Sequence, residues 1–261
     1  MKALLTAASG MMAQELNVEV ISNNIANMRT TGYKRQRAEF QDLLYNNLRD
    51  PGATSSATGT VAPSGIQLGS GVKTGATYRI MSQGNVLQTE KELDIAIRGE
   101  GMFQISLPDG RTAYSRDGSF DLDANGALVN IDGYAVQPSI TIPSTARTVT
   151  IAADGTVTAL LDDSTSPTVL GQLQLARFVN KAGLEAIGDN LFLETESSGP
   201  AQIGTPSEAG FGNLLQSHLE QANVNAVSEI SDLIAAQRAY EMNARIISAA
   251  DQMLQATSNI R

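Results

Sequence analysis

The apolar residues of this chain change their spacing twice along its length. Residues 4–26 carry apolar side chains every three or four positions, which predicts an amphipathic helix that ends near Asn27. The middle follows a strand-and-turn pattern. Residues 213–261 then return to a helical period, with alternating spacings of four and three as in the seam of a coiled coil. A stripe at each end of the chain indicates termini that pair with each other or with neighbouring subunits.

The two stripes define the candidate assembly residues. One face of an ordinary core helix would explain either stripe alone, but the C-terminal one is long for a globular domain. Gln237 and Asp251 interrupt the C-terminal seam, where a polar group often fixes the register at a cost in stability. The large side chains expected at the seams are Leu5, Met12, Leu16, Val20 and Ile25 at one end and Ile230, Leu233, Tyr240, Ile247 and Leu254 at the other.

A stretch rich in Pro, Gly, Ser, Ala and Thr follows the first helical segment, at residues 50–71. From Pro51 to Gly59 no side chain is large enough to anchor a core, so composition alone favours a flexible loop. The short apolar run just before it, from Phe40 to Leu48, could be a helix or an extended arm.

The middle of the chain, residues 77–205, is predicted to be rich in β-strands. Short apolar or alternating runs are separated by pairs such as Asn125-Gly126 and Asp154-Gly155. These pairs suit hairpin turns because Gly accepts a positive φ and Asn or Asp tolerates it. No helical pattern intervenes, which indicates an antiparallel sandwich or a barrel-like domain.

Together these patterns predict an α+β fold in which the long terminal helices pair as a coiled-coil-like core domain and an antiparallel β-rich domain is inserted between them. We expect a discontinuous helical domain from residues 1–48 and 213–261, an extended Gly/Ser/Thr-rich arm over residues 49–76, and an outer β-rich domain over residues 77–212.

The composition excludes several classes of function. The formal net charge is -9, which argues against a nucleic-acid partner because phosphate binding needs a basic footprint. The chain has no Cys and a single His, His218, which argues against thiolate zinc sites, a Cys nucleophile and His-based catalysis. No run approaches the roughly 18 apolar residues of a membrane span. We expect no cofactor, no metal, no catalytic residue and no membrane insertion.

One segment resembles a calcium loop. Asp121, Asp123, Asn125 and Gly126 satisfy the first half of the pattern, and Asp132 stands where a bidentate Glu is expected. Asp is shorter than Glu, and the flanking residues have the pattern of strands rather than helices. We interpret the segment as an Asn-Gly hairpin turn.

Two other sequence patterns are better explained by local structure or surface position than by a ligand site. Gly99-Glu100-Gly101 is half of a dinucleotide fingerprint, but it lacks the third Gly and the helix, so we interpret it as a turn that enters a strand. The basic cluster Arg29, Lys34, Arg35 and Arg37 has too few aromatic neighbours for a nucleic-acid site. A solvated face, or a patch that meets Glu39 or Asp42 of another copy, explains it better.

Three ordered motifs resemble those of the flagellar rod and hook proteins, over nearly the whole chain. The first is Ser22–Arg35. The second joins Gly99–Phe103 with Tyr114–Phe120. The third comprises Glu229-Ile230, Ala236–Glu241 and Asp251–Leu254. Hook proteins of this family are usually longer, and the insertion that contains Pro51, Gly52, Pro63, Gly65 and Gly69 resembles the one characteristic of the distal rod.

The resemblance implies a non-enzymatic subunit that self-assembles into a rigid hollow helical tube, the drive shaft that transmits torque to the hook and lets export substrates pass. It implies location in the periplasm-spanning rod of the basal body. It also implies export in an unfolded state by the flagellar type III apparatus without a cleaved signal peptide, and terminal helices that become ordered on assembly. The implied partners are further copies of the chain, proximal rod proteins, the hook protein, the P and L rings and the export apparatus.

Two alternatives remain at this point. A proximal-rod subunit of the same family would share the terminal motifs. A secreted β-domain binding module with a coiled-coil stalk would need one continuous seam, whereas here the seam is split between the two ends of the chain.

Overall fold

The computed structural model describes residues 2–52, 63–162 and 166–259, and it divides the chain into two compact units. The first unit consists of residues 1–25, 36–78 and 225–261, and the second of residues 26–35 and 79–224. The long helices belong to the first unit and most strands to the second, which confirms the α+β class and the β-rich body between two terminal helices.

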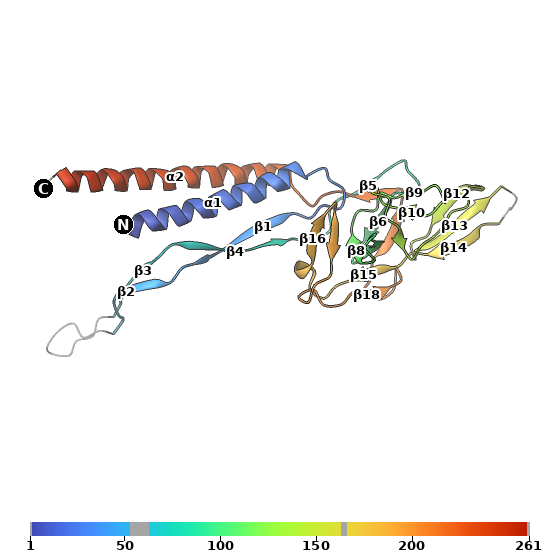
Figure 1. Ribbon diagram of the computed structural model, residues 1–261, viewed down its shortest axis with the longest axis horizontal. Coiled ribbons are helices and arrows are strands. Elements are labelled where there is room, and N and C mark those ends of the chain that lie inside the picture. The colour runs from blue at the N-terminus through green and yellow to red at the C-terminus, as the bar shows by residue number, and fades with distance from the viewer. Residues whose placement is uncertain (1, 53–62, 163–165, 260–261) are drawn as a thin grey trace. The chain divides into compact units, whose positions relative to one another are not determined.

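The first unit contains both long helices, α1 (Lys2–Ala26) and α2 (Ala226–Asn259). They run side by side in opposite directions, as Figure 1 shows. The helix predicted over residues 4–26 is confirmed. After α1 the chain turns: Thr30 N donates to the carbonyl oxygen of Asn27 over 3.0 Å, and Gly32 follows with a φ of 69°.

The second helix begins later than its sequence pattern indicated. Helical spacing was expected from Asn213, but α2 starts at Ala226, where Asn225 caps it. The Asn225 Oδ1 accepts hydrogen bonds from the backbone N–H groups of Val227 and Ser228, at 3.0 and 3.3 Å, which satisfies donors that a helix start leaves unpaired. The intervening residues form strands β19 (Asn213–Gln216) and β20 (His218–Glu220), because sheet neighbours provide partners for their backbone groups.

Two ribbons of two strands complete the first unit. Strand β1 (Gln36–Asp42) lies beside β4 (Val72–Arg79), and β2 (Tyr45–Arg49) pairs in antiparallel register with β3 (Ile66–Gly69). The run from Phe40 to Leu48 is therefore extended. Residues 66–69, within the Gly/Ser/Thr-rich stretch, are a strand. Most of the segment from Pro51 to Gly59 that was expected to be a flexible loop lies outside the described residues, which omit residues 53–62.

The second unit is built from antiparallel ladders. Its largest sheet has seven strands in the order β16-β17-β8-β7-β15-β18, with β11 also paired to β7. A three-stranded sheet β12-β13-β14 and the pairs β9-β10, β6-β19 and β5-β20 complete it. The strands not yet bounded are β5 Val86–Gln88, β6 Ile95–Arg98, β7 Met102–Ser106, β8 Thr112–Ser115, β9 Asp121–Leu122, β10 Leu128–Val129, β11 Val136–Gln137, β12 Ala146–Ile151, β13 Thr156–Leu161, β14 Thr168–Gln172, β15 Leu175–Arg177, β16 Glu185–Gly188, β17 Leu191–Leu193 and β18 Gln202–Gly204.

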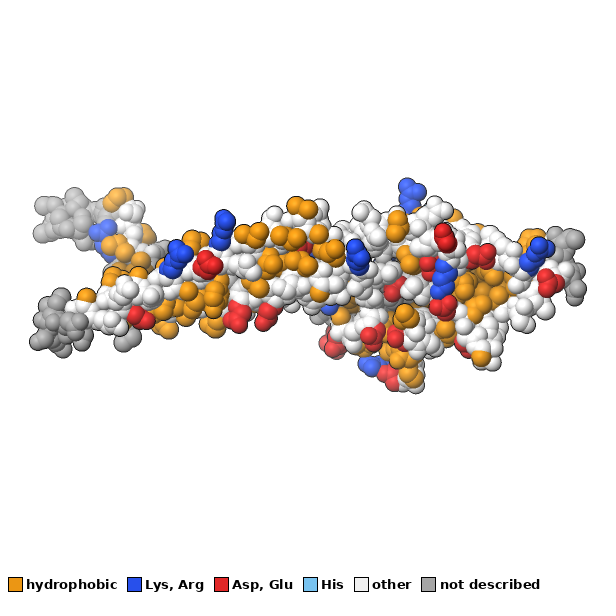
Figure 2. Space-filling model, turned by 90° about the horizontal axis from the view of Figure 1, so that it is seen from above, with side chains coloured by type: hydrophobic (Ala, Val, Ile, Leu, Met, Phe, Trp, Pro, Cys, Tyr) orange, Lys and Arg blue, Asp and Glu red, His pale blue; other side chains and the backbone are white. Residues whose placement is uncertain are grey.

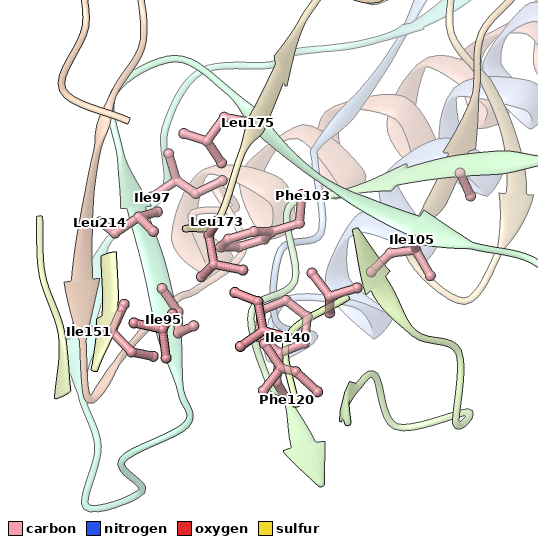
Figure 3. Packing of buried hydrophobic residues seen from close by; sticks show 14 of the residues in the cluster. Ile95, Ile97, Phe103, Ile105, Phe120, Ile140, Ile151, Leu173, Leu175 and Leu214 are labelled. Atoms are coloured by element: carbon pink, nitrogen blue, oxygen red, sulfur yellow. The ribbon is translucent and has the colours of Figure 1, made fainter. Parts of the chain in front are cut away.

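Two buried apolar clusters lie among these sheets, and the larger one is the main core. Ile95, Phe103, Phe120 and Leu173 are fully buried at its centre and point toward one another in Figure 3. Phe103 and Phe120 meet edge to face with ring centroids 5.0 Å apart, a geometry that adds about 0.5–1.5 kcal/mol to the burial itself. Leu214 of β19 also belongs to this core, so the last strands before α2 are an integral part of the β-rich unit.

The calcium-like segment is the hairpin turn that the sequence predicted. Strands β9 and β10 pair on either side of it. Asp123 Oδ1 accepts hydrogen bonds from the backbone N–H groups of Asn125 and Ala127, both at 2.8 Å, and Gly126 has a φ of 80°. The carboxylate of Asp123 is thus engaged by its own turn, and Asp132 belongs to a neighbouring turn with Asn130.

Candidate assembly site

Five of the polar side chains that the structure buries are linked to one another by hydrogen bonds or ion pairs. Four of the five come from the motifs described above: Asn24 and Lys34 from the first, Arg116 from the second and Glu229 from the third. The fifth, Glu220, lies before the third motif. The five residues form two separate clusters, one in each unit. Only partnered polar groups are tolerated at such depth, so the partners reveal what each cluster holds in place.

The first cluster, the Asn24–Glu229 junction, joins three segments of the helical unit. Asn24 Nδ2 donates to Glu229 Oε2 over 3.1 Å and to the carbonyl oxygen of Gln36 over 2.8 Å. The backbone N–H of Gln36 returns a bond of 2.9 Å to Asn24 Oδ1. Asn24 and Glu229 are each 1% exposed. One amide side chain therefore fixes α1 to the first strand and to the start of α2.

The two helices approach again further along, at Gly10. A Cβ placed on Gly10 would lie 2.9 Å from Nδ2 of Asn243. Gly10 lies fourteen residues before Asn24, and Asn243 lies fourteen residues after Glu229. Fourteen residues are two heptads, so the same face of each helix meets the other at both points.

The least exposed face of α2 carries small or polar residues. Glu229, Ala236, Asn243 and Ala250 recur every seventh position, and three of them are buried while Asn243 is half-buried. Small side chains allow a close approach of the helix, but they bury little apolar area. The large apolar side chains of α2 whose burial is described are half-buried or exposed.

Many large apolar side chains on the helices are exposed. Among the predicted seam residues, Val20 is buried, and Leu16, Ile25, Leu233 and Ile247 are half-buried. The others are exposed: Leu5, Met12, Ile230, Tyr240 and Leu254. Figure 2 shows hydrophobic side chains gathered along the helical part of the chain. The exposed set also includes Val227, Ile234, Met242, Ile246 and Met253.

The second cluster, called here the ion cluster, lies in the β-rich unit. Glu220 on β20 accepts from Lys34 Nζ through Oε1 and from Arg116 Nε through Oε2, both over 2.6 Å. The backbone N–H of Gly84 adds a third bond to Oε1, at 2.8 Å. Lys34 is 3% exposed, Arg116 6% and Glu220 1%. The cluster thus fastens residues just after α1 and just before α2 to the same β-rich unit.

Other donors of the ion cluster bind carbonyl groups. Arg116 donates to the carbonyl oxygens of Ile97, Gly99 and Gly101, and Lys34 donates to that of Ser82. Gly99 and Gly101 adopt φ values of 108° and 143°, and β7 begins directly after them. The Gly99-Glu100-Gly101 segment is therefore the strand-entry turn that the sequence predicted, and its carbonyls bind an arginine.

Burial and charge act against each other in the ion cluster. Burial disfavours the Glu220 carboxylate, but the charges of Arg116 and Lys34 outweigh it and hold the pKa of Glu220 below its ordinary value. Burial lowers the pKa of Lys34, and the attraction of Glu220 offsets only part of this effect. Removing one partner of such a buried ion pair leaves the other charge uncompensated, which costs about 3–5 kcal/mol.

The structure corrects the interpretation of the basic cluster at Lys34. This side chain does not lie on a solvated face, because it is 3% exposed and paired with Glu220 of its own chain. Arg37 pairs with Glu39 of its own chain at 2.9 Å, on an exposed surface, and its guanidinium stacks over Tyr78 with 5.1 Å to the ring centroid. Sequence spacing could not reveal this, since Glu220 is 186 residues away from Lys34.

The arm residues named from the sequence flank the part that the structure does not describe. Pro51 and Gly52 form a turn after β2, and Pro63 and Gly65 precede β3. A Cβ on Gly65 would lie 2.6 Å from the carbonyl oxygen of Arg49, so the ribbon needs glycine there. Gly69 ends β3 opposite Tyr45. The exposed apolar residues of this ribbon are Leu44, Tyr45, Leu48, Ile66 and Leu68.

Within residues 2–52, 63–162 and 166–259, no group of three or more His, Asp or Glu side chains is placed to hold a metal ion. Neither α1 nor α2, as described, is long and apolar enough to cross a membrane.

Buried polar residues that fasten chain segments, together with exposed apolar residues along terminal helices, define a structural protein that associates with other proteins. Comparison with known families specifies which one. A model described as "Flagella basal body rod protein" matches residues 4–34, "Flagellar hook protein FlgE/F/G D1 domain" matches residues 96–159, and "Flagellar basal body rod FlgEFG protein C-terminal" matches residues 215–260.

Curated relatives agree over the full length. The flagellar basal-body rod protein FlgG of Caulobacter vibrioides is 59% identical, with 100% of each chain covered. Those of Agrobacterium fabrum and of Buchnera aphidicola from Acyrthosiphon pisum are 51% and 47% identical, over 97% and 99% of each chain. The chain belongs to the FlgG family of flagellar basal-body rod proteins, and it is a structural, non-enzymatic subunit of the rod.

Proposed function

We propose that this subunit forms the distal part of the rod, a rigid hollow helical tube that transmits torque to the hook and lets exported proteins pass. In this proposal α1 and α2 pair as an antiparallel coiled coil within each subunit. Their exposed apolar side chains then pack against the helices of neighbouring copies. In such packing, one surface of a copy meets a different surface of the next copy. Contacts of this head-to-tail kind generate filaments when they do not close into a ring.

The observation that carries the proposal is the distribution of side-chain size on the helices. The two contacts between α1 and α2 involve Asn24 with Glu229 and Gly10 with Asn243, whereas large apolar residues such as Met12 and Ile234 are 63% and 45% exposed. Burial of one such side chain stabilises by about 1.5–3 kcal/mol. A helix pair built in this way gains most of its apolar burial from other subunits.

We also propose how the subunit is exported and which proteins it contacts. The subunit is exported unfolded by the flagellar type III apparatus without a cleaved signal, and its termini become fully ordered on joining the tube. It contacts proximal rod proteins at one end, the hook protein at the other, and the P and L rings around it. The arm, from residue 49 to residue 76, packs between subunits and stiffens the tube.

Electron microscopy of the concentrated protein, with circular dichroism before and after assembly, tests the proposal. We expect straight hollow tubes and a rise in helical signal. Ile234→Glu should abolish tubes, and Ser248→Glu, a matched change at an exposed polar position of α2, should reduce them far less. A closed oligomer that is already fully helical in dilute solution would refute the proposal.

The contribution of the arm needs a separate variant. Replacing residues 50–65 by a two-residue Asn-Gly turn keeps the β2–β3 ribbon and removes only its tip. We expect tubes of this variant to be more flexible and hook-like, with a shorter persistence length in micrographs. Straight, rigid tubes from the variant would show that the tip of the arm does not stiffen the rod.

A further inference from the structure

The ion cluster contains one more positive charge than negative. Lys34 and Arg116 share the single carboxylate of Glu220, and their other described partners are neutral carbonyl groups. An ammonium carries three N–H donors. Lys34 uses two of them, toward Glu220 and Ser82, and the described residues provide no acceptor for the third. A buried, incompletely satisfied cation of this kind is costly unless an anion lies nearby.

A cavity of about 110 Å³ lies beside this cluster, within the β-rich unit. Lys34 and Arg116 form part of its wall, and Arg177 and Lys181 add two more positive charges. Glu100 is its single acidic wall residue, and it is paired with Lys181. Four basic groups therefore surround the cavity against two carboxylates, those of Glu100 and the buried Glu220.

The cations of the cavity repel one another. The charges of Arg116 and Lys181 both act on Lys34, in addition to burial, to lower its pKa. This concentration of positive charge stands out in a chain whose net charge is -9. A recess with low-dielectric walls and charge of one sign focuses the field on anything that enters it, so an oxyanion in the cavity would relieve the repulsion and accept the unused N–H of Lys34.

We propose that this cavity is a binding site for a carboxylate, and that an acidic side chain of a second copy of the chain occupies it in the assembled rod. The volume fits the end of an Asp or Glu side chain and is well below the roughly 300–1,000 Å³ of ordinary small-molecule pockets. The chain itself supplies 27 Asp and Glu residues. The identity of the occupant rests on the proposed self-assembly, whereas the preference for an oxyanion does not.

Two wall residues allow the charge of the cavity to be changed in opposite directions. Lys181→Gln removes a positive charge and Glu100→Gln removes a negative one, while both break the same exposed pair. A purely structural role for that pair would give both variants the same effect. An anion site predicts opposite effects. Lys91→Gln, which breaks the exposed pair with Asp121 elsewhere in the unit, is the matched control.

The first measurement is a titration of the full chain, below its assembly concentration, with sodium acetate and with inorganic phosphate at constant ionic strength. Amide NMR signals of Gly99 and Gly101 report on the cavity. We expect saturable shifts, with an acetate affinity about three- to tenfold weaker in Lys181→Gln and stronger by a similar factor in Glu100→Gln. Absence of saturable shifts, or weakening in both variants, would overturn the site.

The second measurement is the critical concentration for tube formation. We expect it to rise about three- to tenfold for Lys181→Gln, to fall for Glu100→Gln and to stay unchanged for Lys91→Gln. Acetate should raise it more than sodium chloride of equal ionic strength. If acetate or phosphate binds but the critical concentration is unchanged in both variants, the site binds a free anion. The proposal that a second copy occupies it is then wrong. If the unmodified chain forms no tubes, the proposed function fails, and the titration still decides whether the cavity binds anions.

Discussion

Asn24 and Glu229 are 205 residues apart in the chain, yet Nδ2 of Asn24 lies 3.1 Å from Oε2 of Glu229, and both side chains are 1% exposed. Because Asn24 also exchanges two hydrogen bonds with the backbone of Gln36, it fixes α1, α2 and the first strand with one side chain. Such a residue has no replacement of similar size that keeps all three bonds, so substitution should have large effects.

Asn24→Ala should destabilise the helical unit by about 1–3 kcal/mol. The substitution removes one hydrogen-bond partner from the buried Glu229 carboxylate and one from the backbone N–H of Gln36. Denaturant unfolding followed by circular dichroism at a helical wavelength measures the change. Ser22→Ala, at an exposed position one turn or less away, is the control and should change stability by less than about 0.5 kcal/mol. Equal stability of both variants would contradict the role of Asn24.

Glu220→Gln should destabilise the β-rich unit by about 3–5 kcal/mol, since Lys34 and Arg116 would keep their buried charges without a counter-ion. Glu39→Gln removes an exposed partner of Arg37, where both side chains are about half exposed, and should change stability far less because water screens the pair. Urea unfolding of the two variants compares them directly. A small effect of Glu220→Gln would show that water reaches the cluster.

Stability of the β-rich unit should fall in acid because of Glu220. The folded pKa of this carboxyl is held below its ordinary 4.5 by Arg116 and Lys34 despite burial. A depressed pKa means that the stabilisation is present above 4.5 and is lost as the pH falls through the folded value. The free energy of unfolding, measured between pH 7 and pH 3, should decline less steeply in Glu220→Gln than in the unmodified chain. Identical slopes would exclude this contribution.

Truncation should give different results on either side of the last strands. A chain that ends at Asn225 keeps β19, β20 and Glu220, and should retain a cooperatively folded β-rich unit that forms no tubes. A chain that ends at Gly212 loses Leu214 from the core and leaves the ion cluster without its carboxylate. The shorter chain should unfold without a cooperative transition in thermal circular dichroism. Tubes from the longer truncated chain would contradict assembly through α2.

Gly10 should tolerate alanine but not leucine. A Cβ there would meet the flexible end of Asn243 at 2.9 Å, which can move aside, and alanine favours a helix by about 1 kcal/mol over glycine. Gly10→Ala should therefore be neutral or stabilising by up to about 1 kcal/mol, whereas Gly10→Leu should cost about 1–3 kcal/mol by forcing the helices apart. Denaturant unfolding of the two variants decides it; a stable leucine variant would mean that the helices do not meet at Gly10.

The features of this protein that depend on local rules could be predicted from the order of its residues. The period of three to four residues predicted α1, the Asn-Gly pair predicted the turn between β9 and β10, and the glycines at 99 and 101 predicted a strand entry. These features follow from backbone preferences of neighbouring residues. The ordered motifs also carried the family resemblance that the comparisons confirmed.

The roles of the buried polar residues, by contrast, became clear only from the folded arrangement of the chain. Lys34 belongs by sequence to an exposed-looking basic cluster, and its partner Glu220 lies in a segment whose pattern indicated helix rather than strand. The start of α2 was likewise set by the cap at Asn225 and by sheet partners for residues 213–220. Hydrogen bonds and ion pairs between residues about 200 positions apart form only when the folded chain brings those residues together. The spacing of residues along the sequence does not indicate which distant residues will meet.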